Sequence, residues 1–213
     1  MHKPYDLIAE QWQAGRGVSW YIEHFSPYID RILEGLPTGA RVLDLGCGTG
    51  QPIAKYMVEH GFRVTGLDES EQMLKFARQA VPEAEFIHAD MVTVELTDTF
   101  DAAVAWDSMF HVERKHHAAI YQKLANALRA GARILLSVGG SAPAEDDSVE
   151  GFTSEMYGQT FYYSGFAPEV ARKLIEESGF EIELWEVDDP TSRVHIAVIA
   201  RKLVPNESGN KPF

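Results

Sequence analysis

Cysteine is nearly absent from this chain of 213 residues, which carries only Cys47. A single cysteine excludes an intrachain disulfide and any metal site built from several cysteines, so we expect no metal centre. No stretch approaches the run of about 18 apolar residues that a membrane-spanning helix needs. The first residues, MHKPYDLIAEQW, also lack the apolar core of a secretion signal. These absences predict a cytoplasmic protein without a membrane anchor.

Basic residues are also scarce, since 19 Lys and Arg stand against 32 Asp and Glu, a formal net charge of -13. A surplus of acid repels nucleic acid and anionic lipid, so we expect neither as a general partner. The basic pairs Arg114–Lys115 and Arg172–Lys173 are small. The apolar and charged shares of 45% and 24% are ordinary for a globular protein. We expect one domain over residues 1–203, as a monomer or homodimer, and a flexible tail over 204–213.

Short β-branched runs alternate with amphipathic stretches along most of the chain, which predicts an α/β fold with a parallel sheet. Ser70 and Pro168 mark expected helix starts. Gly61, Gly131 and Gly179 mark expected helix ends. The expected parallel strands are Arg41–Leu45, Arg63–Leu67, Glu85–Ala89, Asp101–Trp106 and Arg133–Val138.

Two alternating segments, Glu181–Val187 and Val194–Arg201, follow the last expected helix. The link 188–193 is too short for a crossover helix, so these segments must pair as an antiparallel hairpin. Residues 139–165 are rich in Gly, Ser, acidic and aromatic residues and show no clear period. Loops of that length usually carry function, so we expect an excursion that covers a substrate.

The most informative segment is the strand and turn at residues 42–50, which reads VLDLGCGTG. Its glycines permit positive φ angles and let a ligand approach the backbone closely. The dinucleotide-binding fingerprint is G-x-G-x-x-G, but here the third glycine comes one residue early. Asp44 also lies in the strand itself, where a carboxylate repels a pyrophosphate and attracts a cation. The turn therefore favours a cationic cofactor over a dinucleotide.

This turn resembles the first motif of the class I, Rossmann-like S-adenosylmethionine-dependent methyltransferases. The resemblance extends from Val42 to Arg201. It implies a seven-stranded, mostly parallel sheet with helices on both faces and a C-terminal antiparallel hairpin strand. It also implies S-adenosyl-L-methionine as cofactor and S-adenosyl-L-homocysteine as product. In the turn it assigns cofactor contacts to Asp44, Gly46, Cys47, Gly48 and Gly50. The Gly46 carbonyl is expected to accept from the methionine amino group, and Cys47 is expected to pack.

Further acids follow the next strands, at the edge where open α/β sheets bind ligands. The resemblance assigns Asp68 to the ribose hydroxyls and Asp90 to the adenine amine, with the Met91 backbone N–H on a ring nitrogen. Met73 resembles the apolar residue that packs on the adenine face, and ordinary core packing explains it equally well. Each single acid has an alternative explanation as a helix cap or loop residue.

The turn after the fourth expected strand reads Trp106-Asp-Ser-Met-Phe-His111. It lacks the prolines of the (D/N/S)PP(Y/F) turn that is typical of enzymes acting on nucleic-acid bases or protein glutamine. The form W-D-S-x-F-H resembles a group of small bacterial methyltransferases, which predicts a small-molecule acceptor. The resemblance places Trp106 and Asp107 at the methyl-donor site. If the acceptor must lose a proton, His111 and then Asp107 are the candidate bases; His111 as a packing residue remains an alternative, and His116 and His117 are expected at the surface.

Two segments are expected to cover the site. Residues 1–35 resemble the N-terminal helical lid of the family, with Tyr5 near the cofactor carboxylate and Arg16 and Trp20 toward the substrate. The aromatic residues of the excursion suit an apolar, aromatic or cationic acceptor. Packing of a helix or an edge strand remains the alternative for both segments. The excursion residues predicted to bind substrate are Tyr157, Tyr162 and Tyr163.

The sequence therefore predicts methyl transfer to a small molecule by in-line displacement at the sulfonium methyl. Two alternatives stay open at this point. One is an RNA methyltransferase acting on tRNA or rRNA, which needs a local basic face. The other is a protein that binds S-adenosylmethionine without turnover.

Overall fold

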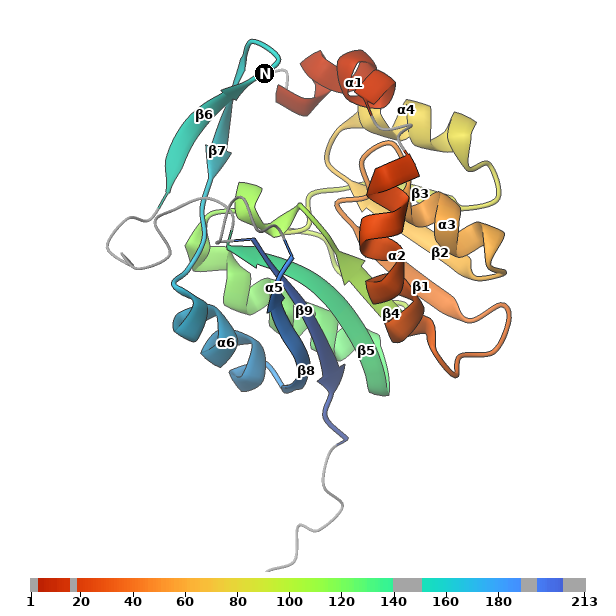
Figure 1. The fold of residues 1–213 in the computed structure, drawn as a ribbon, viewed down its shortest axis with the longest axis vertical. Coiled ribbons are helices and arrows are strands. Elements are labelled where there is room, and N and C mark those ends of the chain that lie inside the picture. Colours follow the sequence, from red (N-terminus) through yellow and green to blue (C-terminus); the bar gives the residue numbers. More distant parts are fainter. Residues whose placement is uncertain (1–3, 16–18, 140–150, 189–194, 205–213) are drawn as a thin grey trace, which may run out of the picture.

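The computed structural model describes residues 4–15, 19–139, 151–188 and 195–204. Their centre is a seven-stranded sheet with the order β3-β2-β1-β4-β5-β9-β8 (Figure 1). All neighbours pair in parallel except β9, which is antiparallel to both β5 and β8. The predicted α/β fold and its final antiparallel hairpin are confirmed. The strands are β1 (Arg41–Leu45), β2 (Arg63–Asp68), β3 (Glu85–His88), β4 (Phe100–Ala105), β5 (Leu128–Gly139), β8 (Phe180–Val187) and β9 (His195–Lys202).

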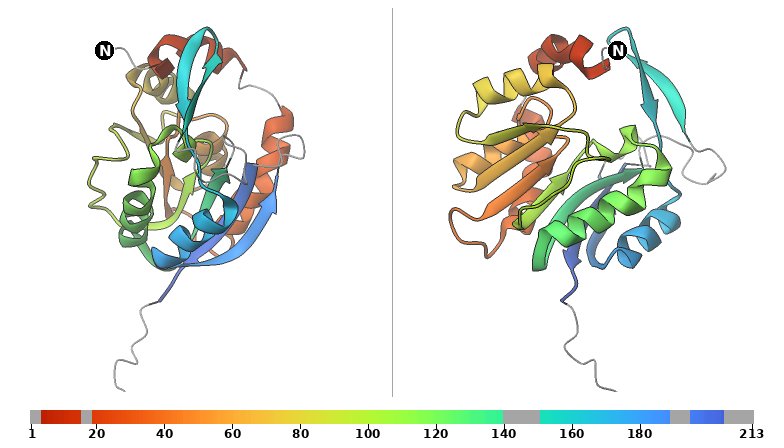
Figure 2. Two further views of the ribbon diagram at one scale, coloured as in Figure 1. Left: turned by 90° about the vertical axis from the view of Figure 1, so that its left-hand side faces the viewer. Right: turned by 180° about the vertical axis from the view of Figure 1, so that it is seen from behind.

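Helices cover both faces of the sheet, as Figure 2 shows from two sides. The helices α5 (Arg114–Ala127) and α6 (Pro168–Glu177) pack on one face. The helices α2 (Ser19–Leu33) and α3 (Ile53–Glu59) pack on the other face. Central strands buried on both faces must be apolar throughout, which explains the continuous apolar runs of the sequence. Among the described helices, none is long and apolar enough to cross a membrane.

Local signals set most of the helix ends. Ser70 caps α4 (Glu71–Ala80) by accepting a hydrogen bond from the Met73 backbone N–H at 3.1 Å. Gly61 and Gly179 follow helices with φ angles of 87° and 94°, as expected of helix-ending glycines.

The prediction for Gly131 as a helix end is wrong. This glycine lies inside β5, which begins at Leu128, directly after α5. Phe100 of β4 pairs with Leu128, whereas Ala102 pairs with Arg133, so the extra residues of β5 form an irregularity around Gly131. The positive φ angle of 78° serves this bulge instead of a helix terminus.

Part of the excursion that appeared aperiodic in sequence is a second, two-stranded sheet. The strands β6 (Phe152–Met156) and β7 (Gln159–Tyr163) pair antiparallel. Alternation along β7 buries Phe161 against α1 (Pro4–Gly15). Figures 1 and 2 show this hairpin and α1 beyond the carboxyl ends of the parallel strands. Residues 140–150 of the excursion and 205–213 of the predicted tail lie outside the described residues.

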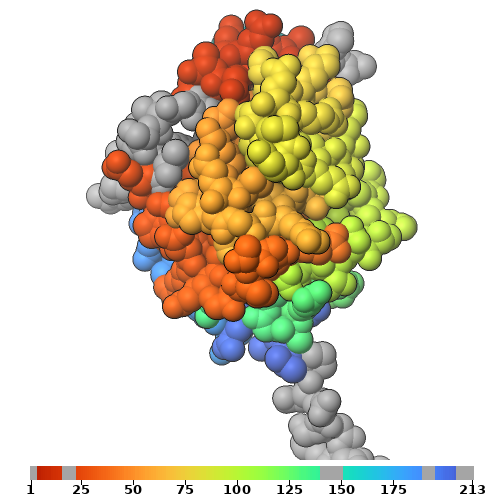
Figure 3. Space-filling view, turned by 90° about the vertical axis from the view of Figure 1, so that its right-hand side faces the viewer, coloured from red at the N-terminus to blue at the C-terminus, as the bar shows by residue number. Residues whose placement is uncertain are grey.

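The predicted N-terminal lid consists of two helices with different surroundings. Helix α2 packs on the sheet, with Phe25 and Ile29 buried in the core. Helix α1 instead lies on α4, as the space-filling view in Figure 3 shows. The Asp6 carboxylate accepts hydrogen bonds from the Ser70 hydroxyl at 2.6 Å and from the Gln72 backbone N–H at 3.3 Å. The residue that caps α4 therefore also holds α1.

This double role of Ser70 gives a prediction for hydrogen exchange. Ser70→Ala should speed amide exchange in both α1 and the first turn of α4, because it removes the cap and the contact to Asp6. The lost cap should lower the free energy of unfolding by about 1 kcal/mol. Asp6→Ala should speed exchange in α1 and at the Gln72 amide, which loses its acceptor, but not at the Met73 amide, since Ser70 still caps α4. Unchanged exchange of α1 in both variants would contradict this attachment.

Candidate functional site

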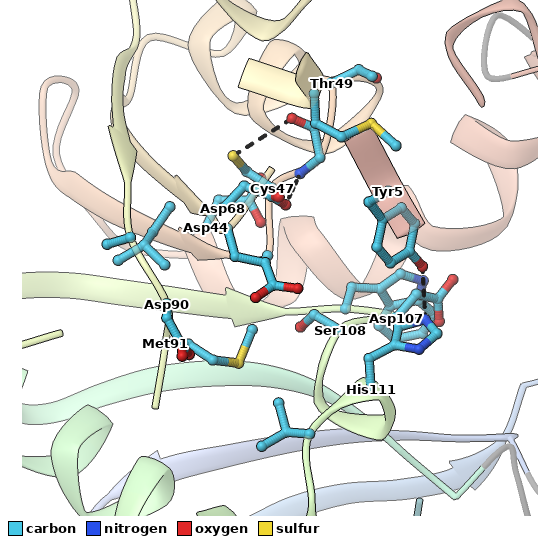
Figure 4. Close-up of a pocket in the computed structure, with 18 of the residues that line it drawn as sticks. Tyr5, Asp44, Cys47, Thr49, Asp68, Asp90, Met91, Asp107, Ser108 and His111 are labelled. Carbon is cyan, nitrogen blue, oxygen red and sulfur yellow. Dashed lines mark hydrogen bonds between the residues drawn. The ribbon is translucent and has the colours of Figure 1, made fainter. Parts of the chain in front are cut away.

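A cavity of about 840 Å³ lies at the carboxyl ends of β1, β2, β3 and β4. This is the edge where open α/β sheets bind ligands. Figure 4 shows Asp44, Asp68 and Asp90 on one side of the cavity and Tyr5 and His111 on the other. Of the residues proposed from sequence, the lining includes Tyr5, Asp44, Gly46, Cys47, Gly48, Asp68, Met73, Asp90, Met91, Trp106, Asp107, His111 and Tyr162.

The glycine turn after β1 lies against the turn after β4. Gly46 has a φ angle of 81°, and a Cβ atom added there would lie 2.3 Å from the Cβ atom of Ser108. Ser108 in turn donates a hydrogen bond from its hydroxyl to the Leu45 carbonyl at 2.8 Å. Only glycine fits this position, because both the backbone angle and the neighbouring serine exclude a side chain.

Gly50 and Cys47 have packing roles in the same turn. Gly50 is not among the described lining residues, and a Cβ atom added there would lie 3.1 Å from the Phe86 ring. Cys47 lines the cavity and packs with Leu74 and Ala77. Burial, followed by the charges of nearby carboxylates, raises the pKa of the Cys47 thiol well above its ordinary value. The thiol therefore stays protonated and unreactive.

Asp68 joins the glycine turn to the start of α4. Its two carboxylate oxygens accept hydrogen bonds from the Gly48 and Ser70 backbone N–H groups, each at 2.8 Å. These bonds fix the carboxylate at the end of β2, where it lines the cavity. A carboxylate oxygen has more than one lone pair, so each can still accept from a ligand hydroxyl.

Asp44 is a buried carboxylate whose second oxygen lacks a hydrogen bond. The residue is 2% exposed, and no described group donates to Oδ2. Burial first, and the charge of Asp68 second, raise the pKa of Asp44 to about 7. A buried carboxyl group of this kind is costly to the ligand-free protein and suits a ligand that brings a positive charge or a donor.

Asp90 and Met91 lie in the loop that follows β3. The Asp90 carboxylate accepts a hydrogen bond from the Val92 backbone N–H at 2.7 Å. The Lys123 ammonium, from α5, donates to the Met91 and Val92 carbonyls at 2.8 and 3.0 Å. This lysine was not singled out from the sequence, and it holds the loop at the cavity wall. Met73, which is 1% exposed, closes the cavity from α4.

His111 is held on both sides of its ring. Its Nδ1 lies 2.8 Å from the Tyr162 carbonyl and its Nε2 lies 2.7 Å from the Tyr5 hydroxyl. A carbonyl can only accept, so Nδ1 carries the proton and Nε2 of the neutral ring accepts from Tyr5. Burial lowers the pKa of His111, which keeps the ring neutral near pH 7. One histidine thus connects α1, the turn after β4 and the β6–β7 hairpin.

Asp107 follows β4 in a left-handed backbone conformation, with φ at 51°. Its Oδ1 accepts a hydrogen bond from His195 Nε2 at 2.8 Å, and His195 Nδ1 donates to Asp188 at 2.5 Å. Burial alone would lower the pKa of His195, but the two carboxylates raise it to about 10. His195 is therefore an imidazolium between two carboxylates at neutral pH.

Some predicted site residues lie away from the cavity. Tyr157 is half exposed at the tip of the β6–β7 hairpin, and Tyr163 stacks between Phe110 and Phe152; neither is among the described lining residues. Arg16 and the Trp20 side chain lie outside the described part of the structure, although Trp20 belongs to α2.

The surface prediction fails for one of the two histidines of α5, His117, whereas His116 is half-buried. His116 lines the cavity. His117 is 4% exposed, with its Nε2 at 2.9 Å from the Val112 carbonyl. Their position at the start of a helix beside the site could not be read from helical periodicity alone.

The sequence analysis also did not identify Ser108, Asp188 and His195 as site residues. Ser108 lies within the W-D-S-x-F-H turn, so the sequence could have indicated that it lies near the glycine turn. His195 and Asp188 flank the link of the terminal hairpin, and their approach to Asp107 depends on the strand order β4-β5-β9. No local pattern in the sequence predicts that order.

The chain matches known proteins across this region. The methyltransferase domain family matches residues 42–131. The putative methyltransferase YqeM of Bacillus subtilis is 31% identical over 173 residues, which cover 77% of this chain and 69% of YqeM. Several further curated relatives are matched over only 34% to 57% of their own length.

Solved structures show the same fold. A S-adenosylmethionine-dependent methyltransferase from Methanosarcina mazei superposes with a TM-score of 0.70 at 23% identity, covering 84% of this chain and 98% of that one. The 1,6-didemethyltoxoflavin-N1-methyltransferase of Burkholderia thailandensis, solved with its acceptor and S-adenosylhomocysteine, has a TM-score of 0.68 at 21% identity. Here the coverage is 94% of this chain and 87% of that one.

The raised pKa of Asp44 predicts a specific pH dependence of stability. In the unfolded chain this group ionises near pH 4, whereas the folded protein holds its proton to about pH 7. The stability that it contributes is thus complete in acid and is lost as the pH rises. Between pH 5 and pH 8 the ligand-free protein should lose about 2 to 3 kcal/mol that Asp44→Asn does not lose. Urea unfolding of both proteins at the two pH values measures this, and parallel pH profiles would refute it.

Proposed function

The chain belongs to the S-adenosylmethionine-dependent methyltransferases, and from that premise we propose that it methylates a small-molecule acceptor. The observation that carries the proposal is the division of one cavity between two kinds of wall. One wall presents carboxylates and backbone groups at the ends of neighbouring strands. The opposite wall presents a neutral histidine, a tyrosine hydroxyl and a carboxylate at the turn after β4.

The residues of the first wall fit the cofactor chemically. S-adenosylmethionine brings positive charges on its ammonium and sulfonium groups and a negative charge on its carboxylate, together with ribose hydroxyls and a flat base. The buried Oδ2 of Asp44, which has no donor among the described residues, suits a cationic ligand. Gly46 lines the cavity, which leaves its main-chain atoms within reach of a ligand. Strand ends that carry carboxylates suit hydroxyl and amine donors.

We assign roles to these residues accordingly. Asp68 accepts the ribose hydroxyls, and Asp90 with the Met91 backbone holds the adenine. The Gly46 carbonyl accepts from the methionine amino group, and Asp44 stabilises the positive charge. The apolar side chain of Met73 packs beside the base. Gly48, Cys47 and Gly50 shape the turn, and Trp106 closes the cavity beneath it.

When bound, the cofactor supplies an electrophilic methyl carbon on a positively charged sulfur. The protein has to align the acceptor with that carbon and exclude water, because the donor is already activated. Helix α1 and the β6–β7 hairpin enclose the acceptor side, where Tyr5 packs edge-on against Phe161 at 4.8 Å between ring centroids. The Tyr5 contact with His111 links this cover to the turn after β4.

His111 is our candidate for removing a proton from the acceptor. Its Nε2 is the ring atom with a lone pair, since Nδ1–H is committed to the Tyr162 carbonyl. The Tyr5 hydroxyl now donates to Nε2, so an acceptor proton reaches the ring by replacing that donor or by passing through the hydroxyl. The lowered pKa of His111 keeps the accepting form populated at neutral pH.

Several observations support a small acceptor over RNA. The W-D-S-x-F-H turn carries no prolines, and the net charge is -13. The basic residues that an RNA site would use are engaged within the protein. Arg114 and Arg172 lie over the rings of Phe166 and Trp185, at 4.8 and 4.5 Å. The Burkholderia enzyme of the same fold, which was solved with bound 1,6-didemethyltoxoflavin, supports the same choice.

The proposed ribose contact is tested by calorimetry with S-adenosylhomocysteine. Asp68→Ala should weaken binding by about 1.5 to 3 kcal/mol, because two hydrogen bonds to a charged acceptor are lost. Glu177→Gln, on the exposed end of α6, removes the same charge away from the cavity and should bind like the parent protein. Equal affinity of Asp68→Ala and Glu177→Gln would contradict the assignment of Asp68.

The proposed base is tested by the pH dependence of methyl transfer from radiolabelled S-adenosylmethionine to a panel of small acceptors. For an acceptor that must lose a proton, His111→Gln should lower turnover by about 100-fold or more. It should also remove an acidic limb that lies below pH 6.5 in the parent protein. Tyr5→Phe should lower turnover less, since Nε2 stays available. Calorimetry on both variants checks that S-adenosylhomocysteine still binds; an unchanged acidic limb in His111→Gln would rule out this base.

A further inference from the structure

The wall of the cavity carries charge of one sign. Six of its described lining residues are carboxylic acids, and none of the described lining residues is Lys or Arg. Three of the acids, Asp44, Asp68 and Asp90, are accounted for by the proposed cofactor contacts. The remaining three, Glu69, Asp107 and Glu113, are not used in the proposed cofactor contacts, and Glu113 is paired with Lys115.

Asp107 and Glu69 lie near the proposed base. The negative charges of both residues act on the His111 ring and oppose the lowering of its pKa by burial. Asp107 lines the cavity with 28% of its side chain exposed, so a ligand can reach it. The acceptor therefore enters a space bounded by a neutral imidazole and carboxylates, a potential that favours cations.

The Asp107 carboxylate is held in place by the rest of the protein. The His195 imidazolium binds its Oδ1, and Asp188, only 2% exposed, binds the other nitrogen of the same ring. His24 contacts the second Asp188 oxygen at 3.2 Å. The Tyr28 hydroxyl donates to Glu186, and the charge of Asp188 helps to raise the pKa of Tyr28. The cluster of Asp107, His195 and Asp188 carries one net negative charge even with the ring protonated.

The backbone of Asp107 is strained, because its φ angle is positive. A residue other than glycine in the left-handed region is strained by roughly 1 kcal/mol. The Asp107 backbone N–H donates to the Ser137 hydroxyl of β5 at 2.7 Å, which helps to hold the turn. The side chain is thereby directed toward His195 and the cavity.

We propose that Asp107 binds the acceptor as an amine, and that His195 and Asp188 position the carboxylate for this contact. The inference rests on the proposed function and names the acceptor class for the same site. Acceptors that carry a carboxylate or phosphate would meet several carboxylates and no lysine or arginine among the described lining residues. Aromatic lining residues, Tyr5, Trp106 and Tyr162, suit the apolar part of such an amine and its cationic group.

The same arrangement explains how an amine becomes a nucleophile. An aliphatic amine enters as an ammonium ion, which has no lone pair. Asp107 holds the ammonium close to His111, and the proton leaves the nitrogen for Nε2 of His111. The electron pair of the broken N–H bond stays on the nitrogen and is available to the methyl carbon. The methylated product is again a cation, so the negative charge of Asp107 complements both the substrate and the product.

Binding of matched ligands in the presence of S-adenosylhomocysteine tests the proposal. The probes are 2-phenylethylamine, 2-phenylethanol and 3-phenylpropanoate, together with an aliphatic set of the same three charge types. Ligand-observed NMR and calorimetry measure their affinities. We expect the amines to bind about tenfold or more tightly than the alcohols, and the carboxylates to bind most weakly. This comparison uses the unaltered protein, so it does not depend on a variant that folds.

Variants then assign the selectivity to Asp107. Asp107→Asn should bring the amine-to-alcohol ratio of affinities close to one. His195→Gln should change the ratio severalfold, because the carboxylate loses both its fixed partner and the neighbouring positive charge. Both variants should retain the S-adenosylhomocysteine affinity of the parent protein, and Glu177→Gln should retain the ratio as well. A merely structural role of His195 would change stability without changing this ratio.

The outcomes separate the two proposals. If S-adenosylhomocysteine binds but carboxylates bind as well as amines, or no amine binds, the amine proposal is overturned while the methyltransferase assignment stands. An amine preference that survives in Asp107→Asn overturns the role of Asp107. If S-adenosylhomocysteine itself does not bind, the proposed cofactor site fails and the acceptor proposal fails with it.

Discussion

The Asp68 carboxylate is the contact on which most of the site depends. It accepts from the backbone of Gly48 in the glycine turn and from the backbone of Ser70 at the start of α4. Ser70 then holds Asp6 of α1 through its hydroxyl. One carboxylate at a strand end thus fixes the glycine turn, and through Ser70 it is also connected to α1, the helix beside the cavity.

The charges of the site are a consequence of where parallel strands end. All carboxyl ends meet at one edge, so acids that follow separate strands converge there. The protein stabilises them in different ways. Asp68 has backbone donors, Asp107 has an imidazolium, and Asp44 has a pKa raised to about 7. Asp44 is the least stabilised of the three, since its Oδ2 has no hydrogen bond within the described structure, so a cationic ligand would stabilise it most.

The sequence predicted the features that local chemistry determines. Strand positions, the Ser70 cap and the terminal hairpin follow from apolar periodicity, side-chain caps and link length. The excursion was harder, because β6 and β7 are short and their residues stabilise each other only after pairing. Gly131 misled the helix prediction because a bulge and a helix end both favour a positive φ angle. The Tyr5–His111 and Asp107–His195 contacts join residues about a hundred positions apart, so no window of sequence contains them.

The two ends of the cavity differ in how far apart in the sequence their residues lie. The cofactor end is built from consecutive strand–turn–helix units, and each contributes its residue through a local motif. The acceptor end is assembled from α1, the turn after β4, the β6–β7 hairpin and the start of β9, which meet only in the folded chain. Segments of this kind can change without disturbing the cofactor turn, so one fold can serve many acceptors. Under our proposal, the acceptor of this chain is selected by the charges that these segments bring together, and those charges favour an amine.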